Sequence, residues 1–195
     1  MSKPVYFLGI DLGSSAVKIT IFDALVGRTI DSVTYPDKEM KIVSKELGWA
    51  EQDPNYWWQC IEKGLLKLKT KNNMEAIISV GISYQMHGLV AVDTNGDPII
   101  PSIIWCDSRA VEIGKKAENK IKGEVLKNQI LNSPGNFTAS KLRWVYENDK
   151  KSFSKIYKIM LPGDFIIFKM TGKISTTPSG LSEGIMWDYN SNSIN

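Results

Sequence analysis

The sequence predicts an α/β fold that begins with an antiparallel meander, and three patterns support this prediction. The run from Tyr6 to Ile10 is apolar throughout, as in a strand that is buried on both faces. Apolar and polar residues then alternate from Val17 to Ile21, which is the period of a second strand. Farther along, apolar residues recur at helical spacing from Trp57 to Leu68, and the apolar run 76–82 has the length of a buried strand.

Length and composition exclude several classes of protein. The 195 residues can form one domain with a sizeable core, and 43% hydrophobic with 23% charged residues is ordinary for a soluble protein. The net charge of +3 is small and no basic cluster is interleaved with aromatics, which predicts no nucleic-acid partner. No apolar run approaches the ~20 residues that span a bilayer, and no signal peptide precedes the first strand, so we expect a cytoplasmic protein without membrane contact.

The cysteine and histidine content argues against a metal site built from these residues. The chain has two cysteines, Cys60 and Cys106, and their spacing is not that of a metal-binding motif. A reduced, cytoplasmic setting is the simplest one for them. His87 is the single histidine, which excludes a histidine-rich site.

The turn between the first two strands is a candidate phosphate site. Asp11 ends the first strand, and Gly13, Ser14 and Ser15 form a turn of small residues. Glycine lets a phosphate approach the backbone, and the serine hydroxyl and N–H groups can donate to its oxygens. The Asp11 carboxylate would hold Mg²⁺, directly or through water, and Lys18 adds a positive charge nearby. A plain hairpin with an Asp-initiated turn explains the same residues, since the pattern is not a Walker A loop.

The remaining elements are predicted from spacing and from turn residues. A third strand at about 29–35 completes the meander. Asp53 and Pro54 suit the start of a helix that ends near Lys69. Later segments are predicted as short strands or a hairpin at 89–100, 102–105 and 159–161, and as helices at 111–121, 139–146 and 165–170. The tail from Tyr189 has no apolar pattern.

Two polar segments follow predicted buried strands. Gln85, Met86 and His87 follow one strand, and Asp107 and Arg109 follow the next. Ligands of open α/β sheets bind outside the carboxyl ends of strands, so this placement favours a functional role. A single histidine is also often a hydrogen-bonded structural residue. Asp107 and Arg109 equally fit a helix cap and a surface ion pair.

Trp49 lies in the polar loop before the first predicted helix. An aromatic side chain in a loop can be a packing plug or a surface on which a sugar stacks. Both interpretations stay open at this point.

Five separated motifs together match a known family. They are Gly9–Ser15; Trp49–Pro54 with Trp57 and Trp58; Gln85–Gly88; Pro101–Trp105 with Asp107 and Arg109; and Lys141–Trp144 followed by Leu161–Asp164. With these motifs, in this order, the chain resembles the N-terminal half of the FGGY carbohydrate kinases, most closely the xylulokinases. The match covers nearly the whole chain, and the Gln85–Gly88 segment points to xylulokinase-like members.

The resemblance implies a ribonuclease-H-like domain of the actin-type ATPase fold: a mixed sheet with an antiparallel N-terminal meander and helices on both faces. Residues 1–195 would be the FGGY N-terminal domain, which binds sugar and phosphate, and this domain would be truncated. The nucleotide-binding C-terminal domain and the aspartate that acts as catalytic base would lie beyond residue 195. The fragment alone is therefore expected to be inactive.

The implied activity of the full-length protein is the phosphorylation of a ketopentose by ATP with Mg²⁺, converting D-xylulose to D-xylulose 5-phosphate in carbohydrate metabolism. By position, Asp11 matches the carboxylate associated with Mg²⁺ and phosphate. The matching phosphate-contacting residues are Gly13, Ser14, Ser15 and Lys18, and the expected sugar contacts are Met86, His87, Gln85, Asp107 and Trp49. The full-length protein is a candidate homodimer.

Three departures from the family pattern leave the substrate open. Tyr84, Cys106 and Gly163 stand where Gly, Asn and Lys are common in the family. Tyr84 adds bulk near the expected sugar pocket, so ribulose, gluconate and glycerol remain alternative acceptors. A non-catalytic sugar-binding module of the same fold is a further alternative, although the intact Asp11–Ser15 turn argues against it.

Overall fold

The computed structural model describes residues 4–194, which form two compact units. Unit 1 contains the chain up to Lys41 and the segment Asn55–Gln85. Unit 2 contains the segment Ile42–Pro54 and the chain from Met86 onward. Among the helices of the described range, none is both long enough and apolar enough to cross a membrane.

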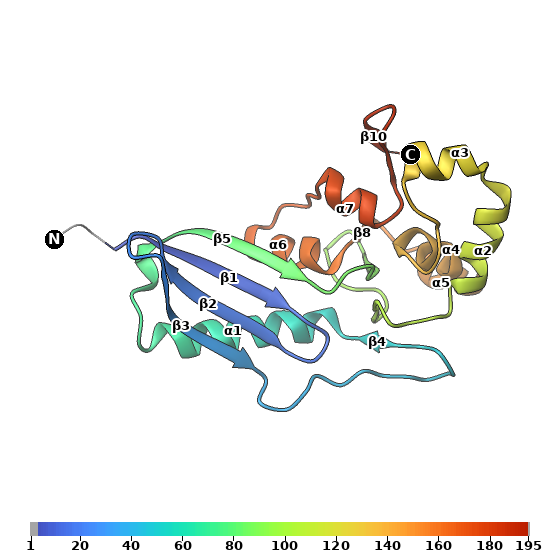
Figure 1. Ribbon diagram of the computed structural model, residues 1–195. Helices are drawn as coiled ribbons and strands as arrows, with labels where there is room; N and C mark the ends of the chain where they lie inside the picture. Colours follow the sequence, from blue (N-terminus) through green and yellow to red (C-terminus); the bar gives the residue numbers. More distant parts are fainter. Residues whose placement is uncertain (1–3, 195) are drawn as a thin grey trace. The chain divides into compact units, whose positions relative to one another are not determined.

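Unit 1 is built on a four-stranded mixed sheet (Figure 1). Its strands, in the spatial order β3-β2-β1-β5, are β3 (Arg28–Tyr35), β2 (Val17–Asp23), β1 (Tyr6–Leu12) and β5 (Ile77–Tyr84). The first three strands pair antiparallel and β5 runs parallel to β1. The predicted meander and the α/β class are thus confirmed.

Helix α1 (Pro54–Lys69) packs on one face of this sheet and supplies its core. Trp57 and Ile61 of the helix are fully buried, as are Val17 and Ile19 of β2. Gly64 marks the closest approach, because a Cβ there would come within 2.8 Å of the Ile19 Cδ1 atom. The predicted helix is therefore confirmed, with its start at Pro54 and its end near Lys69, and η1 (Met74–Ala76) leads from it into β5.

The opposite face of the sheet is open to solvent. Tyr6–Ile10 is predicted to be buried on both faces, and this prediction is wrong, because burial alternates along β1 and Phe7 is 42% exposed. The apolar run 76–82 is likewise not a fully buried strand, since Ile78 of β5 is 66% exposed. Phe7 is exposed because, within residues 4–194, the face of β1 opposite α1 is not covered. Ile78 lies on β5, an edge strand of the four-stranded sheet, at the register shift between β1 and β5.

Unit 2 consists of short strand pairs and helices around a core of Leu89, Ile103 and Val145. Its strand pairs are β4 (Glu51–Gln52) with β7 (Ser102–Ile103), β6 (Val90–Val92) with β8 (Lys158–Met160), and β9 (Trp187–Asp188) with β10 (Ser193–Ile194). Its helices are α2 (Val111–Lys120), α3 (Gly123–Val125), α4 (Thr138–Asn148), α5 (Lys150–Phe153), α6 (Pro162–Thr171) and α7 (Pro178–Glu183), with a π-helical turn η2 (Leu126–Ile130).

Most predicted elements of unit 2 are present, with differences at their ends. The hairpin predicted at 89–100 is wrong in its second strand, because residues 99–100 form no strand. β6 pairs with β8 instead, and a single bridge joins Val92 to Pro98. The predicted strand 102–105 is shorter than expected, because β7 ends at Ile103. The pair β9–β10 lies in and before the tail, where no apolar pattern is present. Two-residue strands leave too few positions for a periodic signal.

Gly114 and Gly123 provide a matched test of the packing of α2. A Cβ at Gly114 would collide with the main-chain carbonyl of Gly135, whereas a Cβ at Gly123 meets nothing within 4 Å. We expect Gly114→Ala to lower the free energy of unfolding by about 2 kcal/mol, because backbone cannot move aside as a flexible side chain can. Gly123→Ala should be neutral or slightly stabilising, since alanine has the higher helix propensity. Urea unfolding measures both, and equal stability of the two variants would contradict this packing.

Candidate functional site

Three polar side chains meet at the end of β1, on the open face of the sheet. Asp11 and Lys18 were predicted as site residues, and Ser83 was not. Asp11 lies opposite Lys18 of β2 in the antiparallel register. On its other side, the Ser83 hydroxyl of β5 donates to Asp11 Oδ1 at 2.7 Å. The three side chains line a shallow pocket of about 460 Å³ together with Gly9 and Gly81, whose missing side chains leave the backbone accessible.

The turn after Asp11 is a closed hairpin turn. The Gly13 N–H donates to the Ala16 carbonyl at 3.0 Å, so this group is engaged within the hairpin. The Ser15 carbonyl accepts from the Met40 N–H at 2.7 Å, and the Ser15 side chain is exposed. The hairpin interpretation thus holds for the Gly13 backbone, while contacts from Ser14 and Ser15 to a phosphate stay a prediction.

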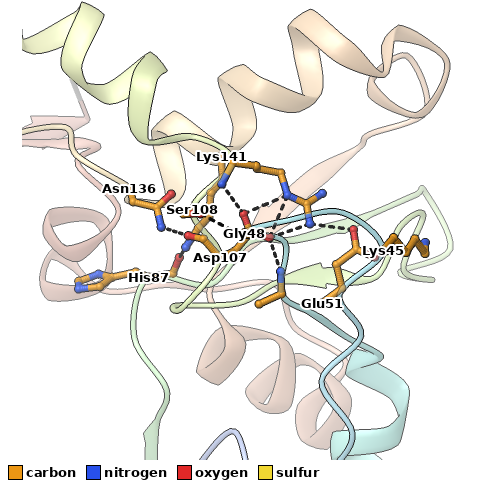
Figure 2. Close-up of polar contacts among 10 residues, drawn as sticks. Lys45, Gly48, Glu51, His87, Asp107, Ser108, Asn136 and Lys141 are labelled. Atoms are coloured by element: carbon orange, nitrogen blue, oxygen red, sulfur yellow. Dashed lines mark hydrogen bonds and ion pairs between the residues drawn. The ribbon is translucent and has the colours of Figure 1, made fainter.

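In unit 2, Asp107 lies at the centre of a buried ion network (Figure 2). Its side chain is fully buried, and its two oxygens lie 2.7–3.0 Å from the Nε and Nη2 atoms of Arg109. Arg109 Nη2 is also 2.9 Å from Glu51 Oε1, and the Ala50 N–H donates to Asp107 Oδ2 at 2.6 Å. The cap and surface-pair interpretations are therefore wrong, because α2 has no side-chain cap at Ala110 and the pair is buried.

Two indole rings cover the guanidinium of Arg109. Its Cζ atom lies 3.7 Å from the Trp49 ring centroid and 5.0 Å from that of Trp144. The two rings meet edge to face at 5.2 Å. Aromatic faces attract a desolvated guanidinium, so Trp49 has the packing role that its loop position left open. A contact between Trp49 and a sugar stays a prediction.

The Gln85–Gly88 segment contains the boundary between the two units. The Gln85 side chain is buried, and the main-chain N–H of Gln85 donates to the Leu12 carbonyl of β1 at 2.7 Å. Met86 is 55% exposed and His87 is partly buried. Burial and the nearby Lys141 ammonium lower the pKa of His87, so the imidazole is neutral at pH 7.

Lys141 of α4 also belongs to this region. The sequence predicted no role for Lys141 in the site and named it only as part of a family motif. The side chain is fully buried, and its Nζ donates to the His87 carbonyl at 2.5 Å. Desolvation lowers the pKa of Lys141 to about 8, although the Asp107 charge opposes this effect. A signal was present, because Lys141 lies on the same helix face as the buried residues Thr138 and Val145.

The predicted site residues thus divide between the units. Asp11, Gly13, Ser14, Ser15, Lys18 and Gln85 belong to unit 1, and Trp49, Met86, His87 and Asp107 belong to unit 2. Within unit 1, Asp11 and Lys18 share one pocket. Within unit 2, Asp107 and Trp49 meet at Arg109.

Comparison with known proteins identifies the family of this chain. The model of the FGGY family of carbohydrate kinases, N-terminal domain, matches residues 6–193. The chain belongs to the FGGY family of carbohydrate kinases. The family expectation drawn from the five motifs is therefore confirmed.

Individual FGGY relatives carry the name xylulose kinase. A protein of that name from Staphylococcus epidermidis is 39% identical over 170 residues, covering 86% of this chain and 33% of the relative. One from Staphylococcus xylosus is 32% identical over 187 residues, covering 93% and 37%. The chain thus spans about a third of the length of these curated relatives.

Solved FGGY structures share the fold. The crystal structure of a xyloylose kinase from Brucella ovis matches with a TM-score of 0.87 at 26% identity, covering 97% of this chain and 39% of that one. A Plasmodium falciparum glycerol kinase crystallised with ADP matches with a TM-score of 0.84 at 21% identity, covering 98% and 39%. The actin-like ATPase fold expected from the sequence is confirmed.

The ion network predicts that replacing Arg109 lowers the stability of the protein far more than replacing Arg143. We expect Arg109→Gln to lower the free energy of unfolding by about 3–5 kcal/mol, because it leaves the buried Asp107 carboxylate without its cation and Glu51 with only the exposed Lys45. Arg143→Gln, which removes an exposed partner of Glu147, should cost less than about 1 kcal/mol. Chemical unfolding compares the two variants, and a similar small loss for both would contradict the energetic role of the network.

The lowered pKa of Lys141 predicts a pH dependence of stability with a defined sign. Between pH 8 and the ordinary lysine pKa of 10.5, the unfolded chain binds a proton at Lys141 that the folded chain has released. The free energy of unfolding of the wild type, relative to Lys141→Met, should therefore rise with pH across this window. Lys116→Met, at an exposed lysine, is the control. The difference in free energy of unfolding between this variant and the wild type should not change with pH. A flat or falling difference for Lys141→Met would contradict the prediction.

Proposed function

We propose that this chain is the truncated N-terminal domain, which binds sugar and phosphate, of a cytoplasmic FGGY kinase. The full-length enzyme would transfer the γ-phosphoryl group of ATP to a ketopentose, with D-xylulose as the first candidate and D-xylulose 5-phosphate as the product. The observation that carries the proposal is the Asp11, Lys18 and Ser83 pocket, at the end of β1, in a chain of this family. The curated relatives named xylulose kinase support the choice of sugar.

The Asp11 pocket suits a phosphate-bound cation better than a metal cage built by the protein. In residues 4–194, no group of three or more His, Cys, Asp or Glu side chains is arranged to hold a metal ion. Mg²⁺ usually keeps several waters and binds through one or two carboxylates plus substrate phosphates. One exposed carboxylate, with Oδ1 fixed by Ser83, fits that mode. Bound Mg²⁺ would neutralise charge on the phosphate oxygens.

Phosphoryl transfer depends mostly on positioning and electrostatic stabilisation, and both tasks can be assigned to this chain. The Lys18 ammonium would attract the phosphate oxygens, and the Ser14 and Ser15 hydroxyls would orient them toward the acceptor. The acceptor hydroxyl would lose its proton to an aspartate located beyond residue 195. The chain alone lacks this base, so we propose that it does not turn over.

On the sugar side, we propose that Met86 and His87 contact the ketose. Met86 offers exposed apolar surface, and the neutral His87 ring can exchange hydrogen bonds with hydroxyl groups. Asp107 is fully buried and occupied by Arg109 and Ala50, so we assign it a structural role that holds the sugar site in shape. Dimerisation of the full-length protein stays a prediction.

The proposed roles predict different kinetic effects in a full-length kinase that contains this chain. Asp11→Ala should lower kcat by about 100-fold or more, because its contribution is realised in the transition state. His87→Ala should mainly raise the KM for D-xylulose, by about tenfold, because it removes a ground-state sugar contact. Exposed Asp37→Asn is the control and should behave as the wild type. Near-normal turnover of Asp11→Ala would reject the phosphate role.

The chain of 195 residues provides a second test. Coupled detection of ADP should show no ketose-dependent turnover by the chain alone, and measurable turnover would overturn its assignment as an incomplete kinase. Assaying the full-length protein against D-xylulose, ribulose, gluconate and glycerol identifies the acceptor. Sugar binding without ADP formation by the full-length protein would instead favour the non-catalytic module.

A further inference from the structure

His87 is held through both of its main-chain polar groups. Its carbonyl accepts from Lys141 Nζ of α4 at 2.5 Å, and its N–H donates to Glu183 Oε1 of α7 at 2.5 Å. The residue has a φ of +60°, in the left-handed region that side chains other than glycine seldom adopt. Such a conformation persists when surrounding contacts determine it, and here two helices supply them.

The carboxylate of Glu183 also lies beside the imidazole ring. Glu183 Oε1 is 3.7 Å from His87 Nδ1, and Nδ1 is buried without a hydrogen bond to any described residue. The side chain of His87 is 25% exposed, so its accessible part is the remainder of the ring. The His87 and Phe137 rings meet in a T-shaped arrangement with centroids 4.1 Å apart. Figure 2 shows the His87 ring directed away from Asp107.

The position of Glu183 is set by the docking of α7 on α4. The Gly184 carbonyl, directly after α7, accepts from the Ala139 N–H of α4 at 3.0 Å. Ile185 then takes a positive φ of +61°, an unusual conformation for a β-branched residue. The carboxylate that reaches His87 thus comes from a short helix whose end is anchored to the helix that bears Lys141.

The two charged groups constrain the protons of the ring in complementary ways. Burial and the Lys141 ammonium both disfavour a second proton on the ring, and both lower the pKa of His87. The Glu183 carboxylate favours placing the one remaining proton on the nearer nitrogen, Nδ1. The ring nitrogen that carries no proton keeps a lone pair that can accept a hydrogen bond.

We propose that Glu183 is a positioning residue that fixes His87 in its Nδ1–H tautomer, so that Nε2 presents a lone pair toward a hydroxyl group of the sugar. His87 would then act as a hydrogen-bond acceptor, and the sugar hydroxyl would be the donor. The tautomer follows from the contacts of the chain itself, whereas its use toward a sugar rests on the proposed function.

Nuclear magnetic resonance can test the tautomer directly, because His87 is the single histidine of the chain. The protein is labelled with ¹⁵N-histidine, and the two ring nitrogen shifts are measured near pH 7.5. We expect a protonated Nδ1 and an unprotonated Nε2 in the wild type. Glu183→Gln should shift the majority of the ring to the Nε2–H form that histidine favours in water, because the amide keeps the shape and loses the charge. Exposed Glu118→Gln is the matched control and should leave the spectrum unchanged.

Each outcome decides the question. An Nε2–H ring in the wild type overturns the proposal without reference to any variant, and so does a Glu183→Gln spectrum identical to that of the wild type. In a full-length kinase, Glu183→Gln should weaken D-xylulose binding about tenfold while ATP binding is unchanged. If the tautomer changes and no variant or wild type binds any ketose, the positioning role stands and the proposed sugar function fails.

Discussion

The buried contact between Asp107 and Arg109 constrains most of unit 2. A carboxylate removed from water costs several kcal/mol unless its oxygens are occupied, and here Arg109 and the Ala50 N–H occupy them. The guanidinium is itself desolvated and needs Glu51 and the two indole faces. The segment 42–54, the segment after β7 and helix α4 must therefore be in place together. This makes the network cooperative, since removing Arg109 leaves the buried Asp107 carboxylate without its cation.

Helix α4 connects this network to His87. Trp144 of α4 packs on Arg109, while Thr138 and Lys141, at earlier turns of the same helix, donate to the carbonyls of Gly88 and His87. A shift of α4 would therefore move the His87 backbone as well as the ion network. The proposed sugar site would therefore be held rigid by a helix that is fixed at several points.

The periodic elements could be predicted from the sequence, and the charged contacts could not. The spacing of Trp57, Ile61 and Leu68 fits a helix and not a strand, and Pro54 marks the start, so α1 was predicted close to its observed ends. The apolar run at Tyr6–Ile10 says nothing about whether both faces find a partner, so the burial of Phe7 was misjudged. A spacing of two residues between Asp107 and Arg109 is the same in a surface pair and in a buried one. Glu183 reaches His87 across 96 residues of sequence, and no local pattern reports such a contact.

The two proposed binding regions differ in how far each is shielded from water. The His87 region of unit 2 is largely desolvated, so its charges act strongly and its geometry is fixed before a ligand arrives. Asp11 and Lys18 lie instead on an open sheet face, in contact with water. Two unit charges at ~4 Å interact with only about 1 kcal/mol in water and with several times that when solvent is excluded. Charges in this setting can attract a polyanion but stabilise a transition state weakly. The proposed phosphate site would therefore require a further element that excludes water, and this is a physical reason to expect no turnover from these residues alone.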